Sequence, residues 1–202
     1  SSGSESNVSL PAAGNRTHTF TITDNDDPPA DFTVGTITTV GGQVMPRYWN
    51  ATNTAFTVRV PVANNADLEG GSIQVIAKNS TSSYGSLGTS KTILNGELGD
   101  SATITISEAQ FIAHAAYGEA KVITISANIS DQYGNVTQGT ASSTTLTIDT
   151  TDPTAFQVST LTVVGDPVIS GYWNSYNTSL NAIVPIENDP TLIAGTIVLQ
   201  GQ

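Results

Sequence analysis

The chain has 202 residues, with 17 Asp and Glu against 6 Lys and Arg, so its formal net charge is −11 at pH 7. So acidic a chain repels nucleic-acid phosphates, which excludes nucleic-acid binding as a function. It contains no cysteine, which excludes disulfides, thiolate metal sites and cysteine nucleophiles. Because Ser, Thr, Val, Ile, Asn and Gly dominate, we predict an all-β protein with strands joined by polar turns.

The chain lacks sequence features that point to a membrane. It has no run of about 18 apolar residues, the length that a spanning helix needs. Its first residues, SSGSESNVSL, have neither the basic start nor the apolar centre of a signal peptide. We therefore expect no membrane insertion in this segment, and we expect any targeting or anchoring element to lie outside it.

The first predicted module ends near residue 29. Residues 17–23 alternate as a strand that places Phe20 and Ile22 on one face. The strand leads into the segment DNDDPP at residues 24–29, which no strand can continue. The ending TFTITDNDDPP resembles the last strand of Calx-β domains. This resemblance implies that residues 1–29 are the C-terminal end of a Calx-β-like β-sandwich, followed by an acidic linker.

Residues 30–153 carry the pattern of a complete antiparallel β-sandwich. Apolar and polar residues alternate in several short runs, so that Phe56, Val58 and Val60 share one face. Turn residues separate these runs, as is typical of immunoglobulin-type sandwiches. Strands are predicted at residues 32–40, 55–62, 72–77, 89–93, 102–106, 120–129 and 142–148.

One segment departs from the strand pattern. Residues 107–116 begin with a Ser-x-x-Gln capping box, Ser107 to Gln110, and continue with helix-forming residues. We predict a short helix that crosses from one sheet to the other. His114 lies in this helix, and we interpret it as a structural side chain because this module contains no second His or Cys.

The end of the chain repeats its middle. Residues 156–202 align with residues 32–78 without a gap, at an offset of 124 residues, and 18 of the 47 positions are identical. Such a period is typical of tandem modules, which are usually structural or binding units. We therefore predict that residues 154–202 are the N-terminal half of a second module, and that the chain is a window on a longer array.

The order of strand, helical crossover and strand ends on DQYGN at residues 131–135, and SSTTLTIDTTDP follows at residues 142–153. This combination resembles the bacterial Ig-like repeats of large surface adhesins. The resemblance implies an extracellular, secreted protein of the bacterial cell surface, with a structural or stalk role in cell adhesion and with neighbouring modules as partners. The alternative is a set of accessory or glycan-binding modules in a secreted multidomain enzyme that degrades polysaccharides.

Acidic residues gather at the two predicted junctions. The loops at residues 63–70 and 131–135 are expected at the end of the sandwich where the first linker arrives. Calcium takes six to eight oxygen ligands, so we predict that it stiffens these joints; the alternative is that the acidic side chains only cap turns. The candidate ligands are Asp24, Asp26, Asp27, Asp67, Glu69, Asp131 and Asn135 at the first junction, and Asp149, Asp152, Glu187 and Asp189 at the second.

A Tyr-Trp-Asn triplet occurs at the same place in each copy, and its indoles are Trp49 and Trp173. Aromatic faces stack on sugars, which makes a glycan a candidate partner, but packing in the sandwich end is favoured. We predict that the segment is not an enzyme. Its two imidazoles, His18 and His114, lie in different modules, so no catalytic triad can be assembled. Nor does it contain a glycine-rich phosphate loop.

Overall fold

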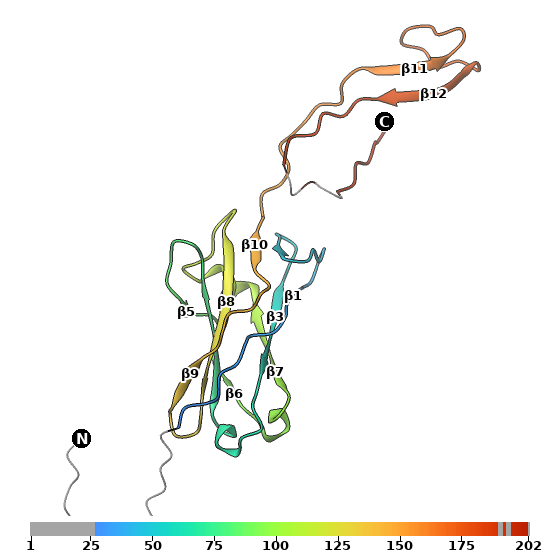
Figure 1. Cartoon of the computed structure of the whole chain (residues 1–202). Coiled ribbons are helices and arrows are strands. Elements are labelled where there is room, and N and C mark those ends of the chain that lie inside the picture. Colours follow the sequence, from blue (N-terminus) through green and yellow to red (C-terminus); the bar gives the residue numbers. More distant parts are fainter. Residues whose placement is uncertain (1–26, 190–191, 193–194, 202) are drawn as a thin grey trace, which may run out of the picture.

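The structure is a computed structural model that describes residues 27–189, 192 and 195–201 (Figure 1). The predicted Calx-β-like strands lie outside these residues. The described chain is all-β, as predicted, with mostly antiparallel strands in two facing sheets and one further hairpin. Among the described residues no helix is long and apolar enough to cross a membrane.

The smaller sheet of the sandwich has three antiparallel strands in the order β1-β3-β7. These strands are β1 (Ile37–Val40), β3 (Ala55–Pro61) and β7 (Ser101–Ser107). The central strand β3 pairs with β7 along its whole length, and both strands alternate between buried and solvent-facing positions. This alternation is the period of two that the sequence shows, so one face of the sheet faces the core.

The larger sheet has seven strands, and its main path runs β2-β10-β8-β4-β5. In addition, β6 pairs with β4 and β9 pairs with β8. Its longest strand, β8, buries apolar residues at alternate positions and also Ser126. The strands are β2 (Tyr48–Trp49), β4 (Ser72–Lys78), β5 (Gly85–Ser86), β6 (Lys91–Thr92), β8 (Val122–Ser130), β9 (Val136–Gln138) and β10 (Leu146–Ile148).

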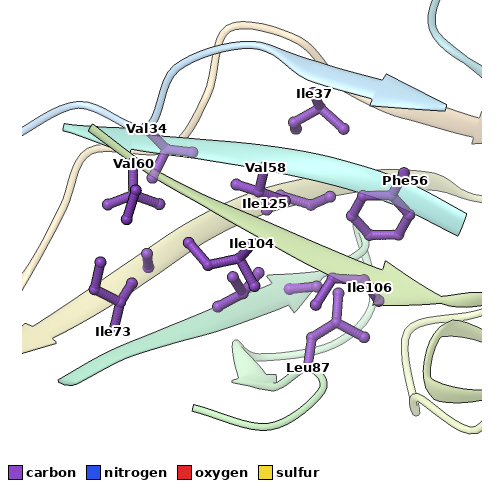
Figure 2. Close-up of a cluster of buried hydrophobic side chains, with 14 of the residues drawn as sticks. Val34, Ile37, Phe56, Val58, Val60, Ile73, Leu87, Ile104, Ile106 and Ile125 are labelled. Atoms are coloured by element: carbon purple, nitrogen blue, oxygen red, sulfur yellow. The ribbon is translucent and has the colours of Figure 1, made fainter. Parts of the chain in front are cut away.

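A single apolar core fills the space between the two sheets (Figure 2). Val58 of β3 and Ile104 of β7 face Ile73 of β4 and Ile125 of β8, and each of these side chains is buried. β-Branched residues dominate the contact, because they fit the pleated surface of a strand and lose little rotamer freedom there. The sandwich that the alternating pattern predicts is therefore formed.

The crossover helix α1 (Glu108–Ile112) starts as predicted and ends earlier than predicted. Ser107 Oγ accepts a hydrogen bond from Gln110 N (3.3 Å), and Gln110 Oε1 accepts one from Ser107 N (3.0 Å). The prediction of a helix to residue 116 is wrong. Ala113 caps the helix, and His114 Nδ1 then accepts the backbone N–H of Ala116 at 3.1 Å, which competes with a further helical turn.

Two short 3₁₀ helices, η1 (Ala66–Leu68) and η2 (Asn95–Glu97), complete the first module. Beyond it, β11 (Leu161–Gly165) and β12 (Asn177–Ala182) form an antiparallel hairpin. Leu161 pairs with Ala182 just as Ile37 pairs with Val58, at the same offset of 124 residues. The sequence repeat is therefore a repeat of strand register as well.

The loop within each hairpin is also built twice. Asn53 Oδ1 accepts the backbone N–H of Asn50 at 2.9 Å, and Asn177 Oδ1 accepts that of Asn174 at 2.6 Å. A second matched pair joins Thr52 N to Asn50 Oδ1 and Tyr176 N to Asn174 Oδ1, both at 2.9 Å. The Asn residues of the repeat thus fix a turn, because a short amide side chain can bond to backbone groups nearby.

The two copies differ in what covers them. Phe56 of β3 is fully buried, whereas its counterpart in β12, Leu180, is 52% exposed. In the first copy β7 lies beside β3, whereas β12 pairs only with β11 in the part of the chain that the structure describes. The apolar face of the second hairpin is therefore open to solvent.

Candidate functional site at the module joints

At the first joint, two loops meet next to the incoming linker. The backbone N–H of Gln132 donates to the carbonyl of Asp67 at 3.0 Å, which ties the loops at residues 63–70 and 131–135 together. The hydroxyl of Thr137 donates to the carbonyl of Pro29, the last residue of the linker. The loops and the linker thus come together at one end of the sandwich.

Asp131 caps the turn that follows β8. Its Oδ1 accepts the backbone N–H groups of Tyr133 and Asn135, both at 2.9 Å, and its Oδ2 accepts Asn135 Nδ2 at 2.9 Å. Desolvation alone would raise the pKa of this buried carboxyl. The hydrogen bonds from Asn135, Tyr133 and Gly134 together outweigh it and hold the pKa below the usual 3.8. Asp131 is therefore an ionised cap whose two oxygens are occupied by its own turn.

The other predicted ligands at this joint do not gather around Asp131. Glu69 Oε2 accepts a hydrogen bond from Asn95 Nδ2 at 3.0 Å, and Asp67 lies in η1. Asp27 is exposed, and Asp24 and Asp26 lie outside the described residues. Among the described residues no three His, Cys, Asp or Glu side chains come together in a group that could hold a metal ion. Calcium at this joint stays a prediction, because two of its proposed ligands, Asp24 and Asp26, lie outside the described residues.

The second joint begins where β10 ends, and we call residues 149–154 its linker. The backbone N–H of Asp149 donates to the carbonyl of Trp49 at 2.9 Å, which continues the parallel pairing of β10 with β2. Asp149, Asp152 and Asp189 line a hollow of about 300 Å³ between the two copies. Although these three residues line the same hollow, they do not form one metal-binding group.

Glu187, another predicted calcium ligand, instead bonds to the linker. Its Oε1 accepts the backbone N–H of Thr154 at 3.0 Å, and its Oε2 accepts the hydroxyl of the same residue at 2.6 Å. Hydrogen bonds to an ionised carboxylate are shorter and stronger than those between neutral groups. Glu187 therefore holds the end of the linker against the second copy.

Glu119, which is not among the predicted calcium ligands, makes the corresponding contact on the first module. Its Oε2 accepts the backbone N–H of Thr150 at 3.0 Å and the hydroxyl at 2.7 Å. The Thr150 hydroxyl is the main cause that lowers the pKa of Glu119, and the bonds from the Thr150 backbone and from Thr151 add to it. Strand pairing explains this contact: Ala120 N donates to Ile148 O, which brings Glu119 beside Thr150.

The two tryptophans of the repeat have different surroundings. Trp49 is 1% exposed, and its ring packs edge to face on Phe111 (5.0 Å between centroids) and on Phe56 (6.1 Å). The predicted packing role is thus confirmed for Trp49, which offers no face to a glycan. Trp173 is 60% exposed, and the neighbouring Tyr172 is 70% exposed.

His114 holds the chain after the crossover helix. Its Nδ1 accepts the N–H of Ala116, so its Nε2, 3.2 Å from the carbonyl of Gly85, is the nitrogen that donates. Both ring nitrogens therefore serve backbone groups of the same module.

The described chain thus defines a class: an all-β sandwich module joined by a short acidic linker to a second copy of its own first hairpin. A scan against protein-family models found no match, and neither did a search of the curated proteins.

Proposed function

We propose that this chain is an extracellular structural segment of a large repetitive bacterial cell-surface adhesin or filament. The observation that carries the proposal is the duplication of sequence, strand register and loop hydrogen bonds at one offset of 124 residues. A chain that repeats its scaffold in this way is typical of a spacer built from modules.

In this proposal the modules contribute length. The incoming linker and the outgoing linker lie at opposite ends of the sandwich (Figure 1), so successive modules extend the chain in one direction. The nine residues of β8 span about 30 Å at about 3.3 Å per residue. The negative charge suits such a solvated spacer, since equal charges keep neighbouring chains apart.

Surface exposure of the module on intact cells tests this proposal. An antibody raised against residues 30–153 is expected to label unpermeabilised cells that express the protein. Brief protease treatment of the cells should remove the label, and a cytoplasmic protein in the same cells serves as the control. Labelling that appears only after permeabilisation would contradict an extracellular role.

A second candidate is a glycan-binding or accessory module of a secreted polysaccharide-degrading enzyme, whose sugar contacts would be the aromatic residues of the second copy. Trp173, Tyr172 and Tyr176 are all at least 60% exposed, and exposed aromatic faces stack on sugar rings. A glycan array probed with the chain separates the two candidates. Binding that is lost in Trp173→Ala would support the glycan-binding module, and no binding is expected of a spacer.

A further inference from the structure

The linker between the copies is bonded at both of its ends. On the first module, the carboxylate of Glu119 accepts both the N–H and the hydroxyl of Thr150. On the second copy, the carboxylate of Glu187 accepts both the N–H and the hydroxyl of Thr154. We call these two contacts the Glu–Thr clamps. Each uses one carboxylate and two donors of a single residue, which fixes the direction of the linker backbone as well as its position.

Few free torsions remain between the Glu–Thr clamps. Only Thr151, Asp152 and Pro153 separate the two clamped threonines. The proline ring fixes its own φ, and it also restricts the preceding Asp152 to extended conformations. Thr151 contributes further hydrogen bonds to Glu119. The orientation of the second copy therefore depends on very few rotatable bonds.

The acidic residues of this joint do not form an alternative anchor. Both oxygens of Glu187 are taken up by Thr154, and no metal-holding group of three acidic side chains exists among the described residues. Asp149 and Asp152 line the hollow of the joint without joining such a group. Calcium is predicted to hold this joint, whereas the contacts that the structure shows there are the hydrogen bonds of Glu187 to Thr154.

We infer that the Glu–Thr clamps, and not a bound metal ion, set the angle between successive modules. This inference rests on the proposed spacer function only for its biological purpose, because a spacer of defined reach needs stiff joints. Glu119 and Glu187 are in this view positioning residues. Each clamp is exposed to solvent and weak alone, but the two act together on a linker with little freedom of its own.

Spin-label distances across the joint test the inference in the whole chain. Because the chain has no cysteine, Thr103→Cys on β7 and Ser179→Cys on β12 place one label on each copy without a background, and both positions are exposed. We expect a narrow distance distribution in this reference protein, unchanged by calcium or by a chelator. The double variant Glu119→Ala/Glu187→Ala should give a broad distribution, with an unchanged thermal unfolding midpoint for the first module.

Matched variants separate the clamps from a general effect of charge. Asp100→Asn removes one carboxylate of the exposed Arg59–Asp100 pair at the opposite end of the module, and it should leave the distribution narrow. Thr150→Val/Thr154→Val removes both hydroxyls with little change in shape and should broaden it, whereas the corresponding Ser variants should keep it narrow.

Two results would overturn the inference: a narrow distribution in the Glu119→Ala/Glu187→Ala variant, or a reference distribution that narrows only when calcium is added. Either result would leave the surface-labelling test of the proposed function untouched. Conversely, failure of surface labelling would leave the clamps standing as a property of the joint.

Discussion

Ala120 adopts a backbone conformation that is costly for its side chain. Its φ is 58°, in the left-handed region, and its N–H donates to Ile148 O at 2.9 Å. A non-glycine residue there loses about 1–2 kcal/mol, whereas glycine adds about 0.5–1 kcal/mol of entropy cost on folding. We predict that Ala120→Gly raises the free energy of unfolding by up to about 1 kcal/mol, measured by urea denaturation.

The matched control is the same substitution in a regular helix. Ala109 is exposed in α1, so Ala109→Gly should lower the free energy of unfolding by about 0.5–1 kcal/mol. If both variants are destabilised equally, the left-handed strain at residue 120 is absent.

Asp131 predicts a pH dependence of stability. Its pKa is lowered from 3.8 in the folded protein, so its ionised form is favoured by folding. The stabilisation is complete above the pKa of the unfolded chain and is lost as the pH falls through the lower folded pKa. The thermal unfolding midpoint of Asp131→Asn should therefore be lower than that of the parent at pH 7. This difference should shrink as the pH drops below about 4.

Asp100 provides the control for this experiment. It is an exposed carboxylate paired with Arg59 at 3.4 Å, and exposed pairs contribute little to stability. The Asp100→Asn variant should follow the pH profile of the parent. A gap between Asp131→Asn and the parent that stays constant down to pH 2 would show that the turn does not depend on the ionised carboxylate.

At the scale of elements, the two hairpins of the repeat place equivalent residues in two different environments, one packed and one exposed. Trp49 is buried against Phe56 and Phe111, whereas Trp173 at the equivalent position is exposed. We predict that Trp49→Ala lowers the free energy of unfolding by about 3–5 kcal/mol because it leaves a large cavity. Trp173→Ala should change it by about 0.5 kcal/mol or less.

Indole fluorescence gives a second measurement on the same pair. Trp49→Phe should leave an emission spectrum typical of a water-exposed indole, from Trp173, while Trp173→Phe should leave the spectrum of a buried one. Similar spectra for the two variants would contradict the different surroundings of the two copies.

The sequence predicts the long elements better than the short ones. The sequence predicts β3 and β7 because seven residues are enough for alternation to appear. β2 and β5 are two residues long and β9 is three, too short for any period, and they exist because longer strands lie beside them. The start of α1 can be predicted because its capping box is formed by residues close in sequence. Its end cannot, because it depends on His114, whose ring contacts Gly85, 29 residues away.

In the candidate site, too, local features can be predicted from the sequence and contacts with distant residues cannot. The acidic residues at both joints could be picked out from the sequence, but not what their carboxylates bond to. Asp131 binds groups within four residues, which matches the turn-capping alternative. Glu119 reaches a residue 31 positions away, and only strand pairing shows that the two are neighbours.

At the scale of the whole molecule, charge opposes compactness. With 17 acidic against 6 basic residues, the cations are too few to pair with most carboxylates, and two salt bridges occur among the described residues. Salt shortens the screening length from about 30 Å at 0.01 M to about 10 Å at 0.1 M. We predict that the thermal unfolding midpoint rises as NaCl is added over this range, and that KCl has the same effect.

A midpoint that falls with added salt would mean that attractive pairs outweigh the net repulsion. Repeating the titration with calcium chloride at matched ionic strength isolates any specific ion. An extra rise with calcium alone would support a bound ion in this chain.

The parallel pairing at the two ends of the module has a mechanical consequence. Thr33 pairs in parallel with Thr140 near the entry of the chain, and β10 pairs in parallel with β2 near its exit. A pull on the two ends of the module therefore loads these hydrogen bonds in shear, so several must break at once instead of one after another. Tension on the proposed filament would thus meet its greatest resistance at the Thr33–Thr140 bridge and at the β2–β10 pair of this module, before the core is exposed.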